Sequence, residues 1–389
     1  MKNYKRTLLA CYLGFVTQAI SANLVPLLFL TFQREYSLSL GNIALISTVF
    51  FLTQLVVDFI CAGYVDRMGY RRCIVLSEVL STLGLAGLAF VPGLFQNAFA
   101  GIILCVVVYA VGSGLIEVLV SPIVEACPFE NKEGAMSLLH SFYCWGTLGV
   151  ILLSTAFFAL FGTESWRILV CLWALVPLYN IYNFATCPIE MLVEEGQSMT
   201  MGQLFKNRLF WLMVVLMVCA GASELAMAQW ASAFAEAALG VSKTVGDLAG
   251  PGLFAIFMGV SRVIFARSEG KIKLRSYMVF SGLLCVVCYL LAALSGSAVL
   301  ALVGCAVCGY AVGIMWPGSI SISAASLPTG GTAMFALLAL AGDLGGAVGP
   351  AIVGAVSQRA GDDLHVGILC GIVFPIVLVI SVLCLNKEK

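Results

Sequence analysis

The chain is a succession of long apolar stretches separated by short polar or charged breaks. A helix needs roughly 20 apolar residues to cross a bilayer, and twelve stretches approach or exceed that length. They are expected near residues 8–31, 43–64, 73–91, 98–126, 135–160, 166–186, 208–236, 247–266, 276–294, 298–327, 332–357 and 366–385. The pattern predicts an all-α membrane protein with twelve transmembrane helices.

The charged residues in the breaks predict how these helices are oriented. Lysine and arginine gather on the cytoplasmic side of membrane proteins. With the N-terminus inside, that side receives all but four of the twenty lysines and arginines, the exceptions being Arg34, Arg167, Lys243 and Arg359. We therefore expect both chain ends to be cytoplasmic. The membrane itself is expected to be a bacterial inner membrane.

A polar interruption halfway along the chain suggests two halves. Residues 187–207 predict a cytoplasmic linker between an N-terminal six-helix bundle, 1–186, and a C-terminal one, 208–389. Short matches offset by about half the chain support a duplicated unit. The matching pairs are Tyr109-Ala-Val-Gly112 with Tyr310-Ala-Val-Gly313, Gly146-Thr-Leu-Gly149 with Gly342-Asp-Leu-Gly345, and Gly63 and Asp66 with Gly259 and Arg262.

Composition excludes several function classes. Only 10% of the residues are charged, against about 25% in soluble domains, and a net charge of zero gives no indication of a nucleic-acid partner. Most of the fifteen cysteines lie in apolar runs, with no CxxC pair beside a histidine in a loop, so they are interpreted as small hydrophobic residues. No nucleophile–base pair, metal cluster or phosphate loop is apparent, so we expect neither an enzyme nor a cofactor.

The densest charge cluster between two apolar runs is Gly63-Tyr-Val-Asp-Arg-Met-Gly-Tyr-Arg-Arg72. In so short a loop the charges must lie at the headgroup surface, where Asp66 can accept from Arg67 or from a neighbouring helix N-terminus. Gly63 permits close approach of another helix and Gly69 a tight turn. The arrangement G-x-x-D-R-x-G-x-R-R resembles the loop between the second and third helices of the major facilitator superfamily. The resemblance implies a twelve-helix transporter and a gating role for Gly63, Asp66, Arg67, Gly69, Arg71 and Arg72.

Six acidic residues fall inside the predicted spans: Asp58, Glu78, Glu117, Glu125, Glu224 and Asp343. Ionisable groups at membrane depth need a partner, a water-filled cavity or a function. No lysine or arginine is expected comparably deep, so Glu117, Glu224 and Asp343, nearest mid-span, are predicted to carry a coupling proton or cation. The other three lie closer to helix ends, where structural roles are equally open. Asp343 could instead serve the gate, because the eleventh helix commonly meets the second in this superfamily.

Glu117 lies in a fourth span that contains two glycines before it and a proline after it. The pattern G-x-G-x-x-E-x-x-x-S-P, from Gly112 to Pro122, resembles the fourth helix of the fucose permease and glucose transporter branch. There the acid takes part in proton coupling or sugar contact. Ser121 stands where that branch more often has Asn, and the first helix lacks the carboxylate of fucose permease, so the proton mechanism is not transferred whole.

The remaining candidates for substrate binding are polar and aromatic residues in four other spans. A sugar site needs flat aromatic faces beside amides and carboxylates. The seventh span carries so much polarity that it resembles the broken seventh helix of sugar-transporting facilitators. The full set of substrate-binding candidates is Gln18, Asn23, Glu117, His140, Tyr143, Trp145, Glu224, Gln229, Trp230 and Trp316.

These features predict a secondary active transporter that takes up a small hydrophilic solute by alternating access. A sugar is the favoured solute and protons or sodium are the coupling ion. A proton-driven exporter of drugs or cationic metabolites is the first alternative, and a non-transporting sensor or scaffold on the same fold is the second. The resemblance to the superfamily implies a monomer.

Overall fold

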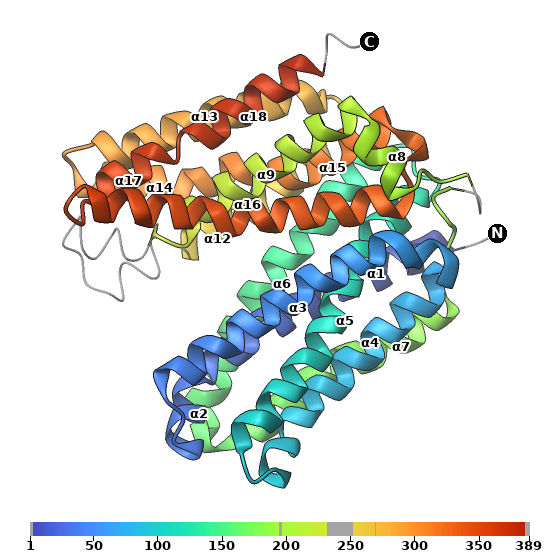
Figure 1. The fold of residues 1–389 in the computed structure, drawn as a ribbon, viewed down its shortest axis with the longest axis vertical. Coiled ribbons are helices and arrows are strands. Elements are labelled where there is room, and N and C mark those ends of the chain that lie inside the picture. The colour runs from blue at the N-terminus through green and yellow to red at the C-terminus, as the bar shows by residue number, and fades with distance from the viewer. Residues whose placement is uncertain (1–2, 194–196, 232–251, 269, 386–389) are drawn as a thin grey trace. The chain divides into compact units, whose positions relative to one another are not determined.

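The computed structural model describes residues 3–193, 197–231, 252–268 and 270–385 (Figure 1). All regular secondary structure in these ranges is helical. Ten of the described helical stretches are long and apolar enough to cross a membrane. The all-α membrane class is therefore confirmed. The last residues of the predicted span 208–236, the first residues of the predicted span 247–266, and Lys243 lie outside the described residues.

Each predicted span corresponds to one helix or to two consecutive helices. In chain order they are α1 (Tyr4–Leu27), α3 (Leu40–Met68), α4 (Tyr70–Leu88), α5 (Ala98–Ala126), α6 (Lys132–Phe161), α7 (Trp166–Thr186), α9 (Arg208–Ala228), α12 (Leu253–Arg267), α13 (Leu274–Leu294), α14 (Ala298–Val312) with α15 (Met315–Ser326), α16 (Gly331–Arg359), and α17 (Leu364–Cys370) with α18 (Val373–Cys384). Two short helices were not predicted: α2 (Phe29–Tyr36), which begins within the last residues of the first predicted span, and α8 (Met201–Lys206), which lies in the predicted linker.

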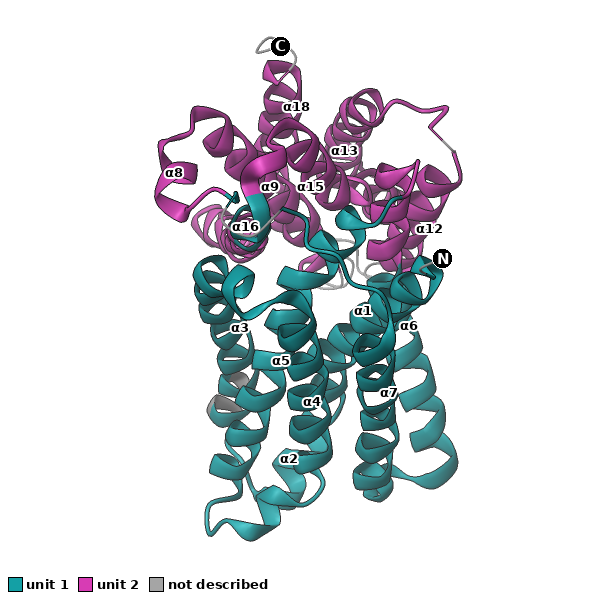
Figure 2. Ribbon diagram, turned by 90° about the vertical axis from the view of Figure 1, so that its right-hand side faces the viewer, with its two compact units in different colours: residues 1–128, 142–198, 331–336 teal, residues 129–141, 199–330, 337–389 magenta. Residues whose placement is uncertain are grey.

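The chain divides into two compact units, coloured separately in Figure 2. Unit 1 comprises Met1–Pro128, Phe142–Ser198 and Gly331–Ala336, and unit 2 comprises Phe129–Ser141, Met199–Gly330 and Leu337–Lys389. Each unit therefore contains the beginning of a helix, α16 or α6, whose remainder belongs to the other unit. The predicted six-helix boundaries, with a linker at 187–207, stay a prediction.

The hydrophobic core of unit 1 is closed at one end by an aromatic and charged cluster. Trp166, at the start of α7, is fully buried and packs edge-on against Phe32 of α2, with ring centroids 5.2 Å apart. Its indole Nε1 donates to Glu35 at 2.7 Å, and the same carboxylate forms an ion pair with Arg167. These contacts attach α2 to α7 and hold the end of the first span in place.

Glycines bring the helices of unit 1 into close contact. A Cβ atom added to Gly112 in α5 would lie 2.5 Å from the carbonyl oxygen of Ser77 in α4, and one added to Gly114 would lie 2.9 Å from Val57 in α3. Real Cβ atoms do not come this close, so a side chain at Gly112 would clash with the backbone of α4, and one at Gly114 would have to displace Val57. The two glycines before Glu117 therefore allow α5 to pack closely against α3 and α4.

The glycine-rich face of α16 packs in the same way within unit 2. A Cβ atom at Gly349 would lie 2.8 Å from the carbonyl oxygen of Ala222 in α9, and one at Gly345 would overlap the carbonyl oxygen of Val218. Small residues at membrane helix interfaces allow backbones to approach and to pack by van der Waals contact. The glycine-rich face of α16 therefore packs against α9, the helix that carries Glu224.

Candidate functional site

Glu117 of α5 lies at the centre of a polar cluster inside unit 1. Its Oε2 atom accepts a hydrogen bond of 2.8 Å from Nε2 of Gln18 in α1 and a second one from Nε2 of Gln54 in α3. Both glutamines are buried, whereas Glu117 itself is half-buried. Hydrogen bonds to a carboxylate are about twice as strong as those between neutral groups. The Glu117 carboxylate therefore connects α5 to both α1 and α3.

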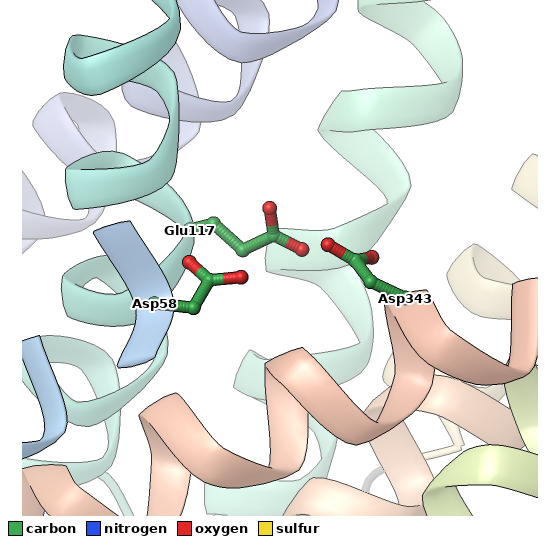
Figure 3. A group of neighbouring side chains, drawn as sticks. All are labelled: Asp58, Glu117 and Asp343. Atoms are coloured by element: carbon green, nitrogen blue, oxygen red, sulfur yellow. The ribbon is translucent and has the colours of Figure 1, made fainter. Parts of the chain in front are cut away.

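Asp58 of α3 adds a second acid to this cluster (Figure 3). It is fully buried, and one of its carboxylate oxygens lies within 4.8 Å of one belonging to Glu117. Two negative charges at this distance repel each other, and one proton or one cation shared by the pair removes that repulsion. Gln18, Gln54, Asp58 and Glu117 are hereafter called the Glu117 cluster. The cluster offers amide donors together with acidic groups that can hold a proton or a cation.

Other predicted substrate-binding residues of unit 1 lie on α1 and α6. The amide Nδ2 of Asn23 donates to the carbonyl oxygen of Ala19 at 2.9 Å and to Oγ1 of Thr147 in α6 at 3.2 Å. Tyr143 and Trp145, also on α6, are half-buried. Asn23 thus joins the first and fifth spans, and part of its hydrogen-bonding capacity is used by the protein itself.

Glu78 of α4 occupies a separate buried polar network in unit 1. Its two oxygens accept from Oγ1 of Thr17 in α1 at 3.1 Å and from Nδ2 of Asn180 in α7 at 2.7 Å. Asn180 also donates to the carbonyl oxygen of Ala10 at 3.0 Å. Because its partners come from two other helices, Glu78 fits the structural role left open for it from the sequence.

Glu224 of α9 is paired with an arginine inside unit 2. Oε2 of Glu224 lies 3.6 Å from the guanidinium of Arg262 in α12, whose side chain is only 4% exposed. The prediction that no cation lies deep enough to meet these acids was therefore wrong for Glu224. Arg262 precedes the end of α12 by little more than one turn, and a long side chain allows its charge to lie far from its Cα atom.

Arg262 also binds the backbone of two other segments of unit 2. Its Nε donates to the carbonyl oxygen of Gly313 at 2.8 Å, and its Nη1 donates to that of His140 in α6 at 2.9 Å. In return, Oγ of Ser137 donates to the carbonyl oxygen of Arg262 at 2.8 Å. The predicted site residue His140 thus contacts the Glu224–Arg262 ion pair through its backbone carbonyl. The imidazole of His140 is buried.

The predicted aromatic residues of unit 2 lie at helix breaks. Helix α9 ends at Ala228, followed by a turn at Gln229 and Trp230, which agrees with the interruption expected in the seventh span. Gln229 is exposed, and Nε1 of Trp230 donates to the carbonyl oxygen of Pro350 in α16 at 3.0 Å. Trp316 lies in the first turn of α15, where its ring packs against the backbone of α16 at Gly342.

The predicted gating loop connects α3 and α4. Asp66 accepts from Oγ of Ser198 at 3.1 Å and from the hydroxyl of Thr332, in the first turn of α16. The Thr332 hydroxyl also lies 2.6 Å from that of Tyr70. A helix N-terminus is a favourable place for a carboxylate. Gly69 has a φ of +84°, in the region that favours glycine, and so makes the turn between the two helices.

The other members of the gating loop have different surroundings. Arg71 donates three hydrogen bonds of 2.7–2.8 Å to the carbonyl oxygens of residues 184, 185 and 187, at the C-terminal end of α7. Arg67, Arg72 and Gly63 are exposed, so a close helix approach at Gly63 stays a prediction. Asp343 is half-buried within α16, and its assignment to gate or cavity also stays a prediction.

An apolar hollow of about 460 Å³ also lies in unit 1, between α3, α4 and α5. Its lining includes Val56, Ile60 and Leu115 and contains no predicted site residue. A small hydrophilic solute would find few hydrogen-bond partners there. The Glu117 cluster is therefore the better candidate for a polar ligand in unit 1.

A sequence model of the Major Facilitator Superfamily matches residues 10–350. The chain belongs to the Major Facilitator Superfamily. The facilitator is thus a multi-pass membrane transporter, as the loop and the twelve-span pattern had indicated. Comparison with curated proteins gives no sequence match.

Solved structures of other facilitators have the same fold over nearly the whole chain. A variant of the E. coli fucose:proton symporter FucP has a TM-score of 0.82 at 14% identity, with 98% of each chain covered. The proton:xylose symporter XylE has a TM-score of 0.81 at 13% identity, covering 98% of this chain and 95% of its own. A bacterial homologue of the iron transporter ferroportin has a TM-score of 0.78 at 15% identity, with both chains covered completely. At these identities the similarity shows the fold alone.

Proposed function

We propose that this facilitator takes up a small hydrophilic solute, with a sugar favoured, together with protons or sodium. The observation that carries the proposal is the Glu117 cluster, in which two amides surround one acid and a second acid lies within 4.8 Å. Amides and carboxylates can bind sugar hydroxyls, and closely spaced acids can carry a proton. The fold likeness to the fucose and xylose symporters supports the same solute class.

In this proposal the charge on Glu117 links ion binding to movement of helices. The ionised carboxylate accepts from Gln18 and Gln54 and so holds α1 and α3 against α5. Protonation weakens both hydrogen bonds, because charge-assisted bonds are the stronger ones. Solute hydroxyls can then compete for the two amides. Binding of the coupling ion and of the solute would favour the same change in the packing of these helices.

Glu224 would have the corresponding role in unit 2. While it is ionised, it shares Arg262 with the carbonyl oxygens of Gly313 and His140. Loss of the Glu224 charge would leave the arginine without its acidic partner and free α9 to move relative to α12. Two acids, each bonded to groups on other helices, can thus connect occupancy to alternating access.

The gating loop completes the proposed mechanism. Asp66 is hydrogen-bonded to Thr332 at the start of α16, and Arg71 is hydrogen-bonded to the end of α7. We assign Asp66 and its neighbours to a latch that opens once in each transport cycle. In the proposed orientation the latch and both termini face the cytoplasm of a bacterial cell, and the transporter acts as a monomer.

A cationic solute is the second candidate, and the Asp58–Glu117 pair favours it. Two acids within 4.8 Å would select a cation, as an exporter of drugs or cationic metabolites requires. The likeness to the ferroportin homologue, whose structure was solved with soaked iron, suits a cationic solute as well.

Ligand-dependent thermal stability separates the two candidates. Purified protein would be heated with sugars, amino acids, nucleosides, lipophilic cations or Fe²⁺, at acid and alkaline pH, with and without sodium. A ligand at a hundred times its dissociation constant should stabilise the protein by about 2.7 kcal/mol. Stabilisation by one sugar that depends on pH or sodium supports the symporter, whereas stabilisation by cations alone supports the second candidate.

A further inference from the structure

Four cysteines of unit 2 have no role in the proposed transport function, yet they follow a regular spacing. Cys285, Cys288, Cys305 and Cys308 form the pattern C-x2-C-x16-C-x2-C, which is typical of metal sites made of four cysteines. The first pair lies on α13 and the second on α14. Residues three apart share one face of a helix. The two helices are joined by residues 295–297, so the spacing can bring both pairs to the same interface.

The structure brings these cysteines, hereafter the thiol cluster, to the contact between α13 and α14. All four are buried, with at most 1% of any side chain exposed. Gly304 allows the two helices to approach closely, because a Cβ atom there would lie 3.0 Å from the carbonyl oxygen of Cys288. The thiol cluster therefore lies within the protein interior, away from solvent.

The distance between two of the sulfur atoms fits a tetrahedral metal ion. Sγ of Cys285 and Sγ of Cys308 are 3.8 Å apart. Zinc binds thiolate sulfur at about 2.3 Å, and two such ligands in tetrahedral geometry lie about 3.8 Å from each other. No three of these four described sulfur atoms lie within 4.8 Å of one another. A third sulfur ligand would therefore need a side-chain rotation at Cys288 or Cys305.

We propose that the thiol cluster binds one thiophilic divalent metal ion of the Zn²⁺ or Cd²⁺ type, anchored by Cys285 and Cys308. Binding forms two metal–sulfur bonds, and the two thiol protons are released to solvent. Two thiolates neutralise a divalent ion, which makes the complex compatible with an apolar interior. Sulfur ligands select thiophilic metals over the hard cations Mg²⁺ and Ca²⁺. The site is independent of the transported solute.

Metal counting on paired variants tests this site. The full-length protein, kept reduced with a non-chelating phosphine, would be incubated with Cd²⁺ and separated from unbound metal, and bound Cd²⁺ would be counted by mass spectrometry. Cys285→Ala with Cys308→Ala should lower the count by one ion per chain. The matched control, Cys105→Ala with Cys219→Ala, also removes two buried cysteines and should keep the wild-type count. Equal counts in all three proteins, or equal losses in both variants, would overturn the proposal.

A measurement on the wild-type protein covers the case in which the paired variant fails to fold. X-ray absorption of the Zn²⁺-loaded wild type should show sulfur neighbours at about 2.3 Å from the metal. A coordination shell made only of nitrogen and oxygen would place the ion elsewhere, for instance at the acidic pair of unit 1, and would contradict the proposal.

Discussion

Replacing Glu117 by glutamine removes the charge at the centre of the Glu117 cluster while preserving the shape of the side chain. Oε2 of Glu117 accepts two hydrogen bonds, from Gln18 and Gln54. A hydrogen bond to a charged group contributes about 1.5–3 kcal/mol and one between neutral groups about 0.5–1.5 kcal/mol. The substitution should therefore weaken the contact of α1 and α3 with α5 by about 2 kcal/mol in total. A change of that size shifts a conformational equilibrium about thirtyfold.

The expected functional result is loss of coupling with retention of solute exchange. In proteoliposomes, the wild-type protein should accumulate the sugar identified by thermal stabilisation when an ion gradient is imposed. Glu117→Gln should reach only the level obtained without a gradient, because residue 117 no longer exchanges a proton or cation. Exchange of labelled for unlabelled sugar needs no net ion movement and should continue, with a rate that no longer follows pH.

Glu125→Gln is the matched control, since it makes the same change two turns further along α5, close to the helix end. It should accumulate sugar like the wild type. Gradient-driven accumulation by Glu117→Gln at the wild-type level would refute the reasoning, because the central charge would then be dispensable.

Three further substitutions test other parts of the account. Arg262→Met should lower the free energy of unfolding by about 3 kcal/mol, because it leaves the half-buried Glu224 without its cationic partner and removes two hydrogen bonds to backbone carbonyls. Adding Glu224→Gln should restore part of that loss, and equal stability of the single and double variants would contradict the ion pair. Gly345→Ala should prevent folding by forcing a methyl group onto α9, whereas Gly149→Ala, with nothing within 4 Å of its Cβ, should leave the yield of monodisperse protein unchanged. Asp66→Asn should slow transport and weaken the latch by about 1–2 kcal/mol. The weakening would be measured as faster labelling, from the cytoplasmic side, of a cysteine engineered at the buried position Ala333, which leaves the Thr332 hydroxyl in place. Unchanged labelling would exclude Asp66 from the latch.

The helices could be predicted closely because apolar length alone determines a membrane span. Helix α5 runs from Ala98 to Ala126 and α7 from Trp166 to Thr186, as the apolar stretches had indicated. Breaks within spans were harder to place. The interruption between α14 and α15 falls at Gly313 and Ile314, within the single predicted span 298–327. Short apolar segments keep their hydropathy when a helix breaks, so hydropathy carries no signal for the break.

Parts of the candidate site could not be predicted because their partners come from distant helices. The motif around Glu117 identified that acid, but nothing local showed that Gln54 and Asp58 of α3 lie beside it. Their spacing of four residues, on one helical face within an apolar run, was the available signal. Arg262 was overlooked as a partner of Glu224 because its position near a helix end hid how far its guanidinium reaches.

A local signal for the short helix α8 was present in the sequence. Thr200 and Gln203 are spaced as a capping box, and the structure contains both of its hydrogen bonds, at 3.3 Å and 2.8 Å. This pattern commonly begins a helix. The low hydrophobicity of residues 187–207 predicts a linker without a membrane span, whereas the capping residues within it mark the start of a short helix.

Solute-driven proton movement tests the central claim of ion-coupled uptake most directly. Proteoliposomes containing the wild-type facilitator would be suspended in weakly buffered medium, and the external pH would be recorded when the stabilising sugar is added, with and without sodium. The account predicts that the medium becomes more alkaline as protons enter with the sugar, or that sugar entry depends strictly on sodium. Sugar entry with neither effect, or acidification of the medium, would contradict the account.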